Sequence, residues 1–239
     1  MNKLTLDPQE VIDSREKEMF RTLRTNIEFT GVENKVITVT SCYPNDGKTT
    51  VSYHLASAFA ESGKKTLFID ADLRKSIFMS RYQIRQEVCG LSHLLSGQAK
   101  LDEVLYETNI ENLYVVLTGV FPMNPTELLG NQRFGEFLSL VRQEFAYIII
   151  DTPPVGSVID AAVVAKQSDA SLLVLASDVV SRGEARRIVN QLKNANPNIL
   201  GVVLNKVDSR GSSYYYGKRY RGYNKYGYGY GYGYGNTSK

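Results

Sequence analysis

The chain has 239 residues, of which 43% are hydrophobic and 22% charged, so it can form one sizeable buried core but has no room for a large second domain. Its apolar runs are far shorter than the roughly 20 residues that cross a bilayer, and we expect no membrane-spanning segment. The net charge is +3, but residues 209–239 carry six basic residues and no acid, which leaves the rest at −3. This small excess of positive charge does not indicate a nucleic-acid partner, and none is expected.

The N-terminal residues and the cysteines narrow the class further. No apolar stretch follows the first charge near the N-terminus, so we expect no secretory signal and a cytoplasmic protein. Cys42 and Cys89, even with His54 and His93, lack a zinc-like spacing and give no disulfide framework. Reduced thiols, no structural metal and no catalytic histidine are therefore expected.

Helical and extended patterns alternate along the chain. A helix is expected over residues 8–30, where Asp7 can cap it, Pro8 takes the first helical position and Gly31 ends it. Strands are expected at 35–41, 66–70, 113–118, 147–151, 171–176 and 200–205, and further helices at 48–62, 91–95, 132–145, 160–166 and 184–195. The strands are apolar on both faces, which predicts an α/β fold with a mostly parallel central sheet flanked by helices. Such sheets bind ligands outside the carboxyl ends of their strands.

The composition changes abruptly after Asp208 to a Gly/Tyr repeat that contains no aliphatic residue. We expect residues 1–208 to form the folded domain and residues 209–239 to be a flexible, disordered tail, because the repeat cannot form an ordinary core. Ten of the 16 tyrosines lie in it: Tyr214, Tyr215, Tyr216, Tyr220, Tyr223, Tyr226, Tyr228, Tyr230, Tyr232 and Tyr234. Taken alone, the repeat is as compatible with a low-complexity tether as with a set of modification sites.

A phosphate-binding loop is predicted between the first strand and the next helix, where residues 41–50 are SCYPNDGKTT. In a P-loop, Lys48 reaches the β- and γ-phosphates, the Thr49 hydroxyl ligates Mg²⁺, and backbone N–H groups cradle the phosphates. Cys42 occupies a position that is usually glycine, so the motif depends on its context, and an accidental GKT sequence is the alternative. The expected nucleotide-binding residues are Asp46, Gly47, Lys48, Thr49 and Thr50.

Two other predicted strands end in carboxylates. Asp70 and Asp72, with Arg74 close behind, end one strand, and Asp151 ends another. Acids at the carboxyl ends of parallel strands beside a P-loop can hold Mg²⁺ directly or through water, and a second acid can orient or deprotonate a nucleophile. A carboxylate that only caps a helix would explain one of these segments and not both.

Together these segments resemble the bacterial tyrosine kinase (BY-kinase) family, with a proline-containing Walker A at 41–50, a Walker A′ D-x-D-x-R at 70–74 and a Walker B at 148–153. The fold that the resemblance implies is P-loop NTPase-like, and the similarity covers essentially the whole chain. The departures from the family pattern are Cys42, Asn45 (often glycine) and Asp46 (often glutamate). None removes a chemical group that phosphate binding requires.

The resemblance implies an ATP-dependent protein-tyrosine autokinase that uses ATP and Mg²⁺ and phosphorylates the tail tyrosines. The residues implied for catalysis are Asp72, as the base that accepts the phenolic proton, with Lys48 and Arg74. Those implied for Mg²⁺ are Thr49, Asp70 and Asp151, although the individual roles of the three acids stay open. Asn205 is expected to contact adenine, with a turn residue as the alternative.

The resemblance also implies partners. Glu18, Arg21 and Arg24 look like the family's E-x-x-R-x-x-R motif, which in relatives helps to assemble a ring of subunits; an intrahelical Glu18–Arg21 salt bridge is the alternative. As the cytoplasmic kinase half, the chain is expected to need a separate transmembrane activator that recruits it to the inner face of the membrane. A cognate tyrosine phosphatase, other protein-tyrosine substrates and a role in capsular or exopolysaccharide synthesis are implied as well.

Two other classes share parts of this pattern. A non-kinase regulatory ATPase of the partitioning or division-site type has the same fold and paired acids, but its signature lysine corresponds here to Tyr43. A module that stacks the Tyr/Arg tail on single-stranded nucleic acid would leave Asp70, Asp72 and Asp151 unexplained.

Overall fold

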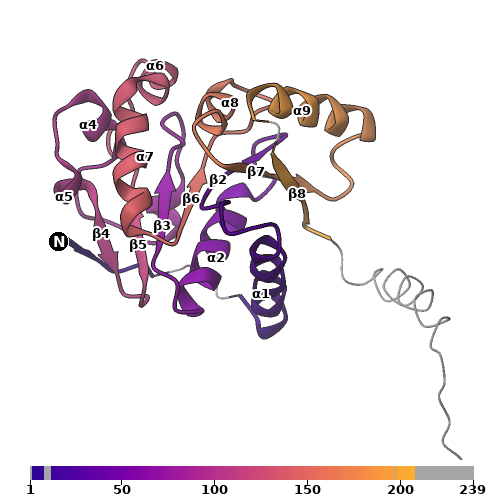
Figure 1. The fold of residues 1–239 in the computed structure, drawn as a ribbon, viewed down its shortest axis with the longest axis horizontal. Helices are drawn as coiled ribbons and strands as arrows, with labels where there is room; N and C mark the ends of the chain where they lie inside the picture. The colour runs from indigo at the N-terminus through magenta and orange to yellow at the C-terminus, as the bar shows by residue number, and fades with distance from the viewer. Residues whose placement is uncertain (1, 8–11, 197, 208–239) are drawn as a thin grey trace, which may run out of the picture. The chain divides into compact units, whose positions relative to one another are not determined.

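A central β-sheet organises the structure, a computed structural model that describes residues 2–7, 12–196 and 198–207. Within these residues the sheet has eight strands in the order β1-β4-β5-β3-β6-β2-β7-β8 (Figure 1). The strands are β1 Asn2–Leu4, β2 Val36–Ser41, β3 Thr66–Asp70, β4 Tyr106–Thr108, β5 Leu113–Val116, β6 Tyr147–Asp151, β7 Ala170–Ala176 and β8 Ile199–Asn205. Neighbouring strands are parallel except β4 and β5, so six of the eight run in one direction and the predicted, mostly parallel sheet is confirmed.

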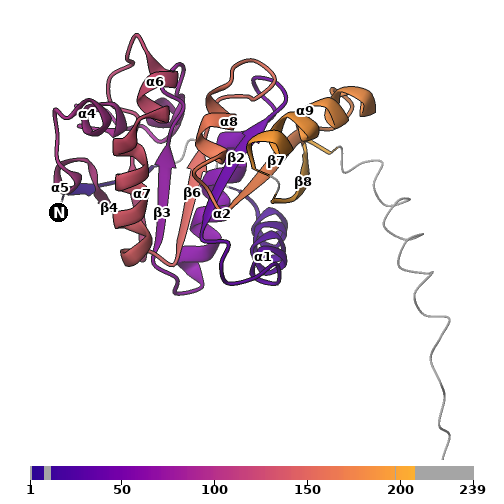
Figure 2. The same ribbon diagram turned by 45° about the horizontal axis from the view of Figure 1, so that its top comes forward.

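The helices cover both faces of the sheet (Figure 2). They are α1 Ser14–Glu28, α2 Lys48–Glu61, α3 Phe78–Arg81, α4 Leu91–Ser96, α5 Leu101–Val104, α6 Pro125–Gly130, α7 Gln132–Glu144, α8 Asp160–Ala165 and α9 Arg182–Ala195. Helices α1, α2 and α3 share one hydrophobic cluster with the sheet, whereas α4 to α7 share another on the opposite face. Helices α8 and α9 extend that second layer over β7.

Strand β6 shows why the strands have no polar face. Ile149 belongs to the cluster under α1 and α2, while Ile148 and Ile150 belong to the cluster under α7. All three side chains are fully buried, because alternate residues of a strand point to opposite faces and helices cover both.

The expected start of the N-terminal helix was wrong. Helix α1 begins at Ser14, and its cap is Asp13, whose carboxylate accepts the Glu16 N–H at 2.8 Å while Glu16 accepts the Asp13 N–H at 3.0 Å. Asp7 instead donates its backbone N–H to the Tyr82 carbonyl at 3.3 Å, and Pro8 lies outside the described residues. The reciprocal capping box at 13–16 was present in the sequence as D-x-x-E, and it is a stronger start signal than Asp7. The helix also ends at Glu28, before Gly31.

Several short elements were not predicted: β1, β4, α3, α5 and α6. Strands β1 and β4 have three residues each, too few to show an alternating pattern, and their pairing depends on contacts between residues about a hundred positions apart. None of the described helices is long and apolar enough to cross a membrane.

The chain divides into two units, Met1–Lys206 and Val207–Lys239. All ten tyrosines expected to accept phosphate, at positions 214–234, lie outside the described residues.

The capping box predicts a measurable difference between two aspartates. Replacing Asp13 by Ala removes a hydrogen-bonded cap and should lower the free energy of unfolding by about 1 kcal/mol in urea denaturation. Asp7→Ala is the matched control, because Asp7 is exposed and outside the helix, and its effect should stay within about 0.5 kcal/mol. Equal losses in the two variants would show that the α1 cap is not the source of the effect.

Candidate active site

Three neighbouring strands bring the predicted motifs together. The order β3-β6-β2 places the Walker B strand between the Walker A′ strand and the strand that leads into the P-loop. In the register of β3 and β6, Asp70 lies directly opposite Asp151. The carboxyl ends of these strands therefore meet at one edge of the sheet, as the sequence predicted.

The P-loop is held in shape by its own side chains. The Asp46 carboxylate accepts the Tyr43 N–H at 2.8 Å, which closes the loop. Asn45 and Gly47 both have positive φ, +67° and +92°, and asparagine tolerates this conformation better than most residues, which accounts for its place where relatives often have glycine. Asn205, at the end of β8, donates its amide to the Asp46 carbonyl at 2.9 Å, so the residue expected to contact adenine lies against this loop.

Cys42 is a packed core residue. Its side chain is fully buried in the cluster that includes Ile188 and Leu192. Burial raises the pKa of the Cys42 thiol to about 11, which keeps it neutral and unreactive near pH 7. The departure from glycine at this position thus adds apolar packing beneath the loop and no charge.

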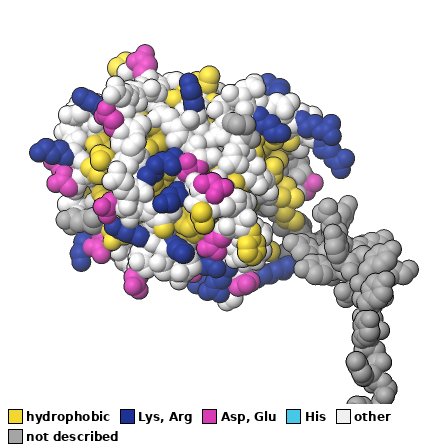
Figure 3. Space-filling view, in the orientation of Figure 1, with side chains coloured by type: hydrophobic (Ala, Val, Ile, Leu, Met, Phe, Trp, Pro, Cys, Tyr) yellow, Lys and Arg dark blue, Asp and Glu magenta, His cyan; other side chains and the backbone are white. Residues whose placement is uncertain are grey.

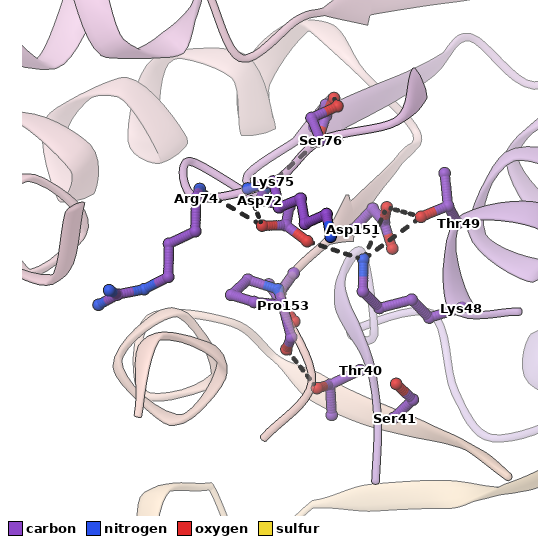
Figure 4. A network of polar contacts seen from close by, with 12 residues as sticks. Thr40, Ser41, Lys48, Thr49, Asp72, Arg74, Lys75, Ser76, Asp151 and Pro153 are labelled. Carbon is purple, nitrogen blue, oxygen red and sulfur yellow. Dashed lines mark hydrogen bonds and ion pairs between the residues drawn. The ribbon is translucent and has the colours of Figure 1, made fainter. Parts of the chain in front are cut away.

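The Lys48 ammonium lies among carboxylates (Figure 4). Its Nζ is 3.1 Å from Asp72 Oδ2 and 3.5 Å from Asp151 Oδ2. The Thr49 hydroxyl donates to Asp151 Oδ2 at 2.6 Å, and the Ser52 hydroxyl donates to Asp151 Oδ1 at 3.1 Å. Residues from β6, α2 and the Walker A′ turn therefore form one network.

The Walker A′ acids have different surroundings. Asp72 is 5% exposed, with Oδ2 facing Lys48 and Oδ1 accepting the backbone N–H groups of Arg74 at 3.4 Å and Lys75 at 3.0 Å. Asp70 is buried and accepts a hydrogen bond from the Ser76 hydroxyl. Asp72 is thus oriented by two amides and remains nearer the surface than Asp70.

Burial and mutual repulsion shift the ionisation of these groups. Burial, together with the charge of Asp151, raises the pKa of Asp70 to about 7, although the Ser76 hydrogen bond opposes the rise. Burial also raises the pKa of Asp151, while Lys48 and Thr49 limit the shift. Burial alone would lower the pKa of Lys48, but the carboxylates, Asp151 foremost, outweigh it and raise the pKa. Lys48 is therefore fully charged, and the site holds more negative than positive charge.

The predicted catalytic residue Arg74 points elsewhere. Its guanidinium pairs with Asp160, at 2.6 Å from Nε to Oδ2, and Figure 4 shows the side chain directed away from Lys48. Thr50, a predicted nucleotide-binding residue, accepts a hydrogen bond from Arg81. The structure thus brings Lys48, Thr49 and the three acids together but leaves the Arg74 side chain outside this group.

His54 packs against aromatic rings, and His93 caps the start of a helix. The His54 ring lies 5.1 Å from the rings of Phe20 and Tyr53, and burial lowers its pKa to about 4. His93 Nδ1 accepts the Gly90 N–H at 3.1 Å at the start of α4.

The proposed oligomerisation motif lies on α1. Glu18 and Arg21 form the intrahelical salt bridge at 3.4 Å, and both side chains are more than half exposed. Arg21 also lies 4.0 Å from the Glu61 carboxylate at the end of α2. Arg24 is less exposed and donates to the Ala58 carbonyl of α2 at 3.2 Å. Two of the three residues are therefore accessible, and the third helps to dock α1 on α2.

Three contributors to the site were missed: Ser52, Ser76 and Asp160. Ser52 lies one helical turn after Lys48, so the pattern of α2 could have indicated it. Ser76 lies only six residues after Asp70, but nothing in the D-x-D-x-R motif points to it. Asp160 had no local signal, because its partner Arg74 is 86 residues away.

The donor set suits a magnesium–nucleotide complex. Helix α2 begins at Lys48 without a side-chain cap, so its first N–H groups have no capping partner and can bind phosphate oxygens. Among the residues that the structure describes, no three His, Cys, Asp or Glu side chains are grouped to hold a metal by themselves. Mg²⁺ sites commonly use one or two carboxylates together with substrate phosphates and water. Thr49, Asp70 and Asp151 fit this role.

Comparisons with known proteins agree on the class. The family model described as an AAA domain matches residues 34–200. The tyrosine-protein kinase CpsD of Streptococcus pneumoniae serotype 4 is 44% identical over 198 residues, which cover 83% of this chain and 87% of CpsD. Fold and site define a P-loop nucleotide-binding protein.

Solved structures refine that class. The kinase domain of the Escherichia coli tyrosine kinase ETK has a TM-score of 0.78 at 34% identity, covering 91% of this chain and 80% of that chain. The chimerical protein CapA2B2 has a TM-score of 0.77 at 30% identity, covering 87% and 94%. The septum site-determining protein MinD of Pyrococcus horikoshii, complexed with Mg-ADP, is less similar, with a TM-score of 0.61 at 26% identity and coverage of 71% and 69%. The chain belongs to the bacterial tyrosine kinase family and is a protein-tyrosine kinase.

The raised pKa of Asp70 predicts a gain in stability on neutralisation. Its pKa is about 7 in the folded protein against an ordinary value of 3.8, so wild-type stability falls as the pH rises between these values and stays reduced above them. In urea denaturation without added nucleotide or Mg²⁺, Asp70→Asn should therefore be more stable than the wild type at pH 8, by about 1 kcal/mol or more, and similar to it at pH 4. A variant less stable than the wild type at pH 8 would contradict the raised pKa.

Proposed function

We propose that this kinase transfers the γ-phosphoryl group of ATP to tyrosines of its own C-terminal segment, in a neighbouring copy of the chain. The observation that carries the proposal is the Asp72 carboxylate, which is held by two backbone amides and lies 3.1 Å from the lysine of the P-loop. This position suits a base that acts next to a bound γ-phosphate.

The phosphates are bound by Lys48 and by the N–H groups of the first turn of α2. Thr49 and Asp151, with Asp70 beside them, hold Mg²⁺, which when bound neutralises phosphate charge and orients the γ-phosphoryl group. Asn205 contacts adenine in this proposal, and its position against the P-loop supports a place near the nucleotide. Asp46, Gly47 and Thr50 complete the loop around the phosphates.

Asp72 acts as the general base. As the tyrosine oxygen bonds to phosphorus and the bond to the ADP oxygen breaks, Asp72 accepts the phenolic proton. Its two amide hydrogen bonds keep one oxygen fixed, and Lys48 neutralises the charge that develops nearby.

The acceptors are the ten tyrosines at positions 214–234. Each phosphate adds nearly two negative charges at pH 7, so a few of them reverse the +6 charge of residues 209–239. Phosphorylation therefore opposes any assembly that relies on attraction between this basic segment and the acidic remainder of another copy.

The proposed partners are those that the resemblance to the family implies. A transmembrane activator recruits this kinase to the inner face of the membrane, a tyrosine phosphatase reverses its reaction, and it modifies other proteins on tyrosine in capsule or exopolysaccharide synthesis. We expect no nucleic-acid partner, because the small net positive charge does not indicate one. On the face shown in Figure 3, basic and acidic side chains are both present.

A regulatory ATPase of the MinD type is the alternative function, favoured by the shared fold. Against it stands Tyr43, at the position of that class's signature lysine. Its hydroxyl is hydrogen-bonded to Glu184, and this bond raises the Tyr43 pKa. Tyr43 thus takes part in local packing and supplies no positive charge.

Phosphotyrosine formation distinguishes the kinase from the regulatory ATPase, and two substitutions test the residues that carry it. With Mg-ATP and the cytoplasmic segment of a candidate activator, the wild type should gain phosphotyrosine confined to residues 214–234, as seen by blotting and peptide mapping. Lys48→Met removes the phosphate-binding charge and Asp72→Ala the base, so each should lower the rate roughly 100-fold or more. ATP turnover without phosphotyrosine in any condition would favour the regulatory ATPase.

The α1 motif predicts a separation of assembly from stability. Glu18→Ala with Arg21→Ala should abolish the oligomer in light scattering yet change the free energy of unfolding by less than about 0.5 kcal/mol, since both side chains are exposed. Arg24→Ala is the contrasting variant and should lower stability, because Arg24 bonds to α2. An unchanged oligomer in the double variant would count against a ring built on this motif.

A further inference from the structure

The Arg74 side chain joins three segments at the carboxyl edge of the sheet. Its Nε donates to Asp160 Oδ2 at 2.6 Å, and its Nη2 donates to Asp160 Oδ1 at 3.0 Å and to Thr126 Oγ1 at 2.9 Å. Thr126 in turn donates to Asp160 Oδ1 at 2.6 Å. The Walker A′ turn is thereby tied to the first turns of α6 and α8.

Asp160 is the fixed centre of this group. Its side chain is fully buried, and its two oxygens accept hydrogen bonds from both Arg74 nitrogens and from Thr126. A buried carboxylate requires such complete pairing, and the planar guanidinium matches it in one geometry. Arg74 is therefore held more rigidly than its exposed fraction of 39% would suggest.

The fixed position of Arg74 also affects Asp72, because the two residues are joined by a hydrogen bond from the Arg74 backbone. Asp72 Oδ1 accepts the N–H groups of Arg74 and Lys75, so the direction of this carboxylate depends on where the turn places those two amides. The side chain of Lys75, in contrast, is exposed. Within the described residues, hydrogen bonds thus link Arg74 to the phosphate-binding Lys48 through Asp72.

We propose that Arg74, Asp160 and Thr126 form a clamp that positions the Asp72 carboxylate, and that Arg74 acts through Asp72 and does not touch the nucleotide or the acceptor tyrosine. Arg74 and Asp160 are then positioning residues, and Thr126 orients Asp160. This inference rests on the proposed role of Asp72 as the base.

The test compares conservative variants of the full chain. Arg74→Lys keeps the charge but loses the forked contact, Asp160→Asn removes the charge at equal size, and Thr126→Val removes the hydroxyl, with Thr126→Ser restoring it. The matched control is Arg142→Lys, because Arg142 pairs with Asp169 at 2.8 Å and is 33% exposed, close to the value for Arg74. The readouts are kcat and KM for ATP, the affinity for a fluorescent ADP analogue, and hydrogen exchange of the Arg74 and Lys75 amides.

If the clamp positions Asp72, Arg74→Lys and Asp160→Asn should each lower kcat roughly 10- to 100-fold while nucleotide affinity changes less than about threefold. Their double variant should lose little more than either single one, since both break the same contact. Thr126→Val should lower kcat and Thr126→Ser should restore it, and Arg142→Lys should match the wild type. The Arg74 and Lys75 amides should exchange faster in the clamp variants only.

Wild-type kcat in Arg74→Lys, or fully additive losses in the double variant, would overturn the clamp. A loss of nucleotide affinity equal to the loss of kcat would also overturn it, because Arg74 would then bind the nucleotide directly. Hydrogen exchange separates this inference from the proposed function. If the two amides exchange faster in the clamp variants than in the wild type, while the wild type phosphorylates no tyrosine, the clamp stands and only the kinase reaction is refuted.

Discussion

One ammonium group among three buried carboxylates is the interaction on which the site depends. Lys48 lies within 3.5 Å of Asp72 and Asp151, and Asp70 adds a third acid close by. Such a cluster destabilises a protein unless each charge is paired or hydrogen-bonded. The hydroxyls of Thr49 and Ser52 and the amides that hold Asp72 supply those bonds. The remaining excess of negative charge is what a divalent cation neutralises, so the same residues that strain the fold suit it to Mg-ATP.

The sheet makes this cluster possible. Because β3, β6 and β2 are adjacent and parallel, their carboxyl ends deliver Asp70, Asp151 and the P-loop to one edge without long loops. Both faces of these strands are buried, so the backbone that carries the acids is rigid. The reacting groups are thus attached to strands that are buried on both faces, whereas the expected acceptor tyrosines come from a segment that lacks aliphatic residues. A rigid site that binds ATP and a separate segment that carries the acceptor tyrosines are compatible with phosphoryl transfer from one copy of the chain to another.

The main strands and the nucleotide-binding motifs could be predicted because both are local features. A run such as Ile148–Ile150 indicates burial on both faces, and GKT between a strand and a helix indicates a P-loop, supported here by the acids that end two other strands. The start of α1 was also encoded locally, in Asp13 and Glu16, but the choice of Asp7 and Pro8 passed over the stronger signal. The start of this helix could therefore have been predicted from the sequence.

Other features are not local and could not be predicted. The partner of Arg74 lies 86 residues away, so the D-x-D-x-R motif indicated an important arginine without showing that it faces Asp160. The pairing of β1 with β4 similarly depends on the completed sheet. For Asn205, the end of β8 could be predicted, but its hydrogen bond to the P-loop backbone could not.

A mixing experiment tests the central claim most directly. Unlabelled wild-type chain would be incubated with isotope-labelled Lys48→Met chain, Mg-ATP and the activator segment, and phosphotyrosine would be assigned to each chain by mass spectrometry. We predict phosphotyrosine at positions 214–234 of the labelled, inactive chain, because an active copy phosphorylates its neighbour. ATP consumption with no phosphotyrosine in either chain would contradict the account, and phosphotyrosine only in the unlabelled chain would contradict transfer between copies.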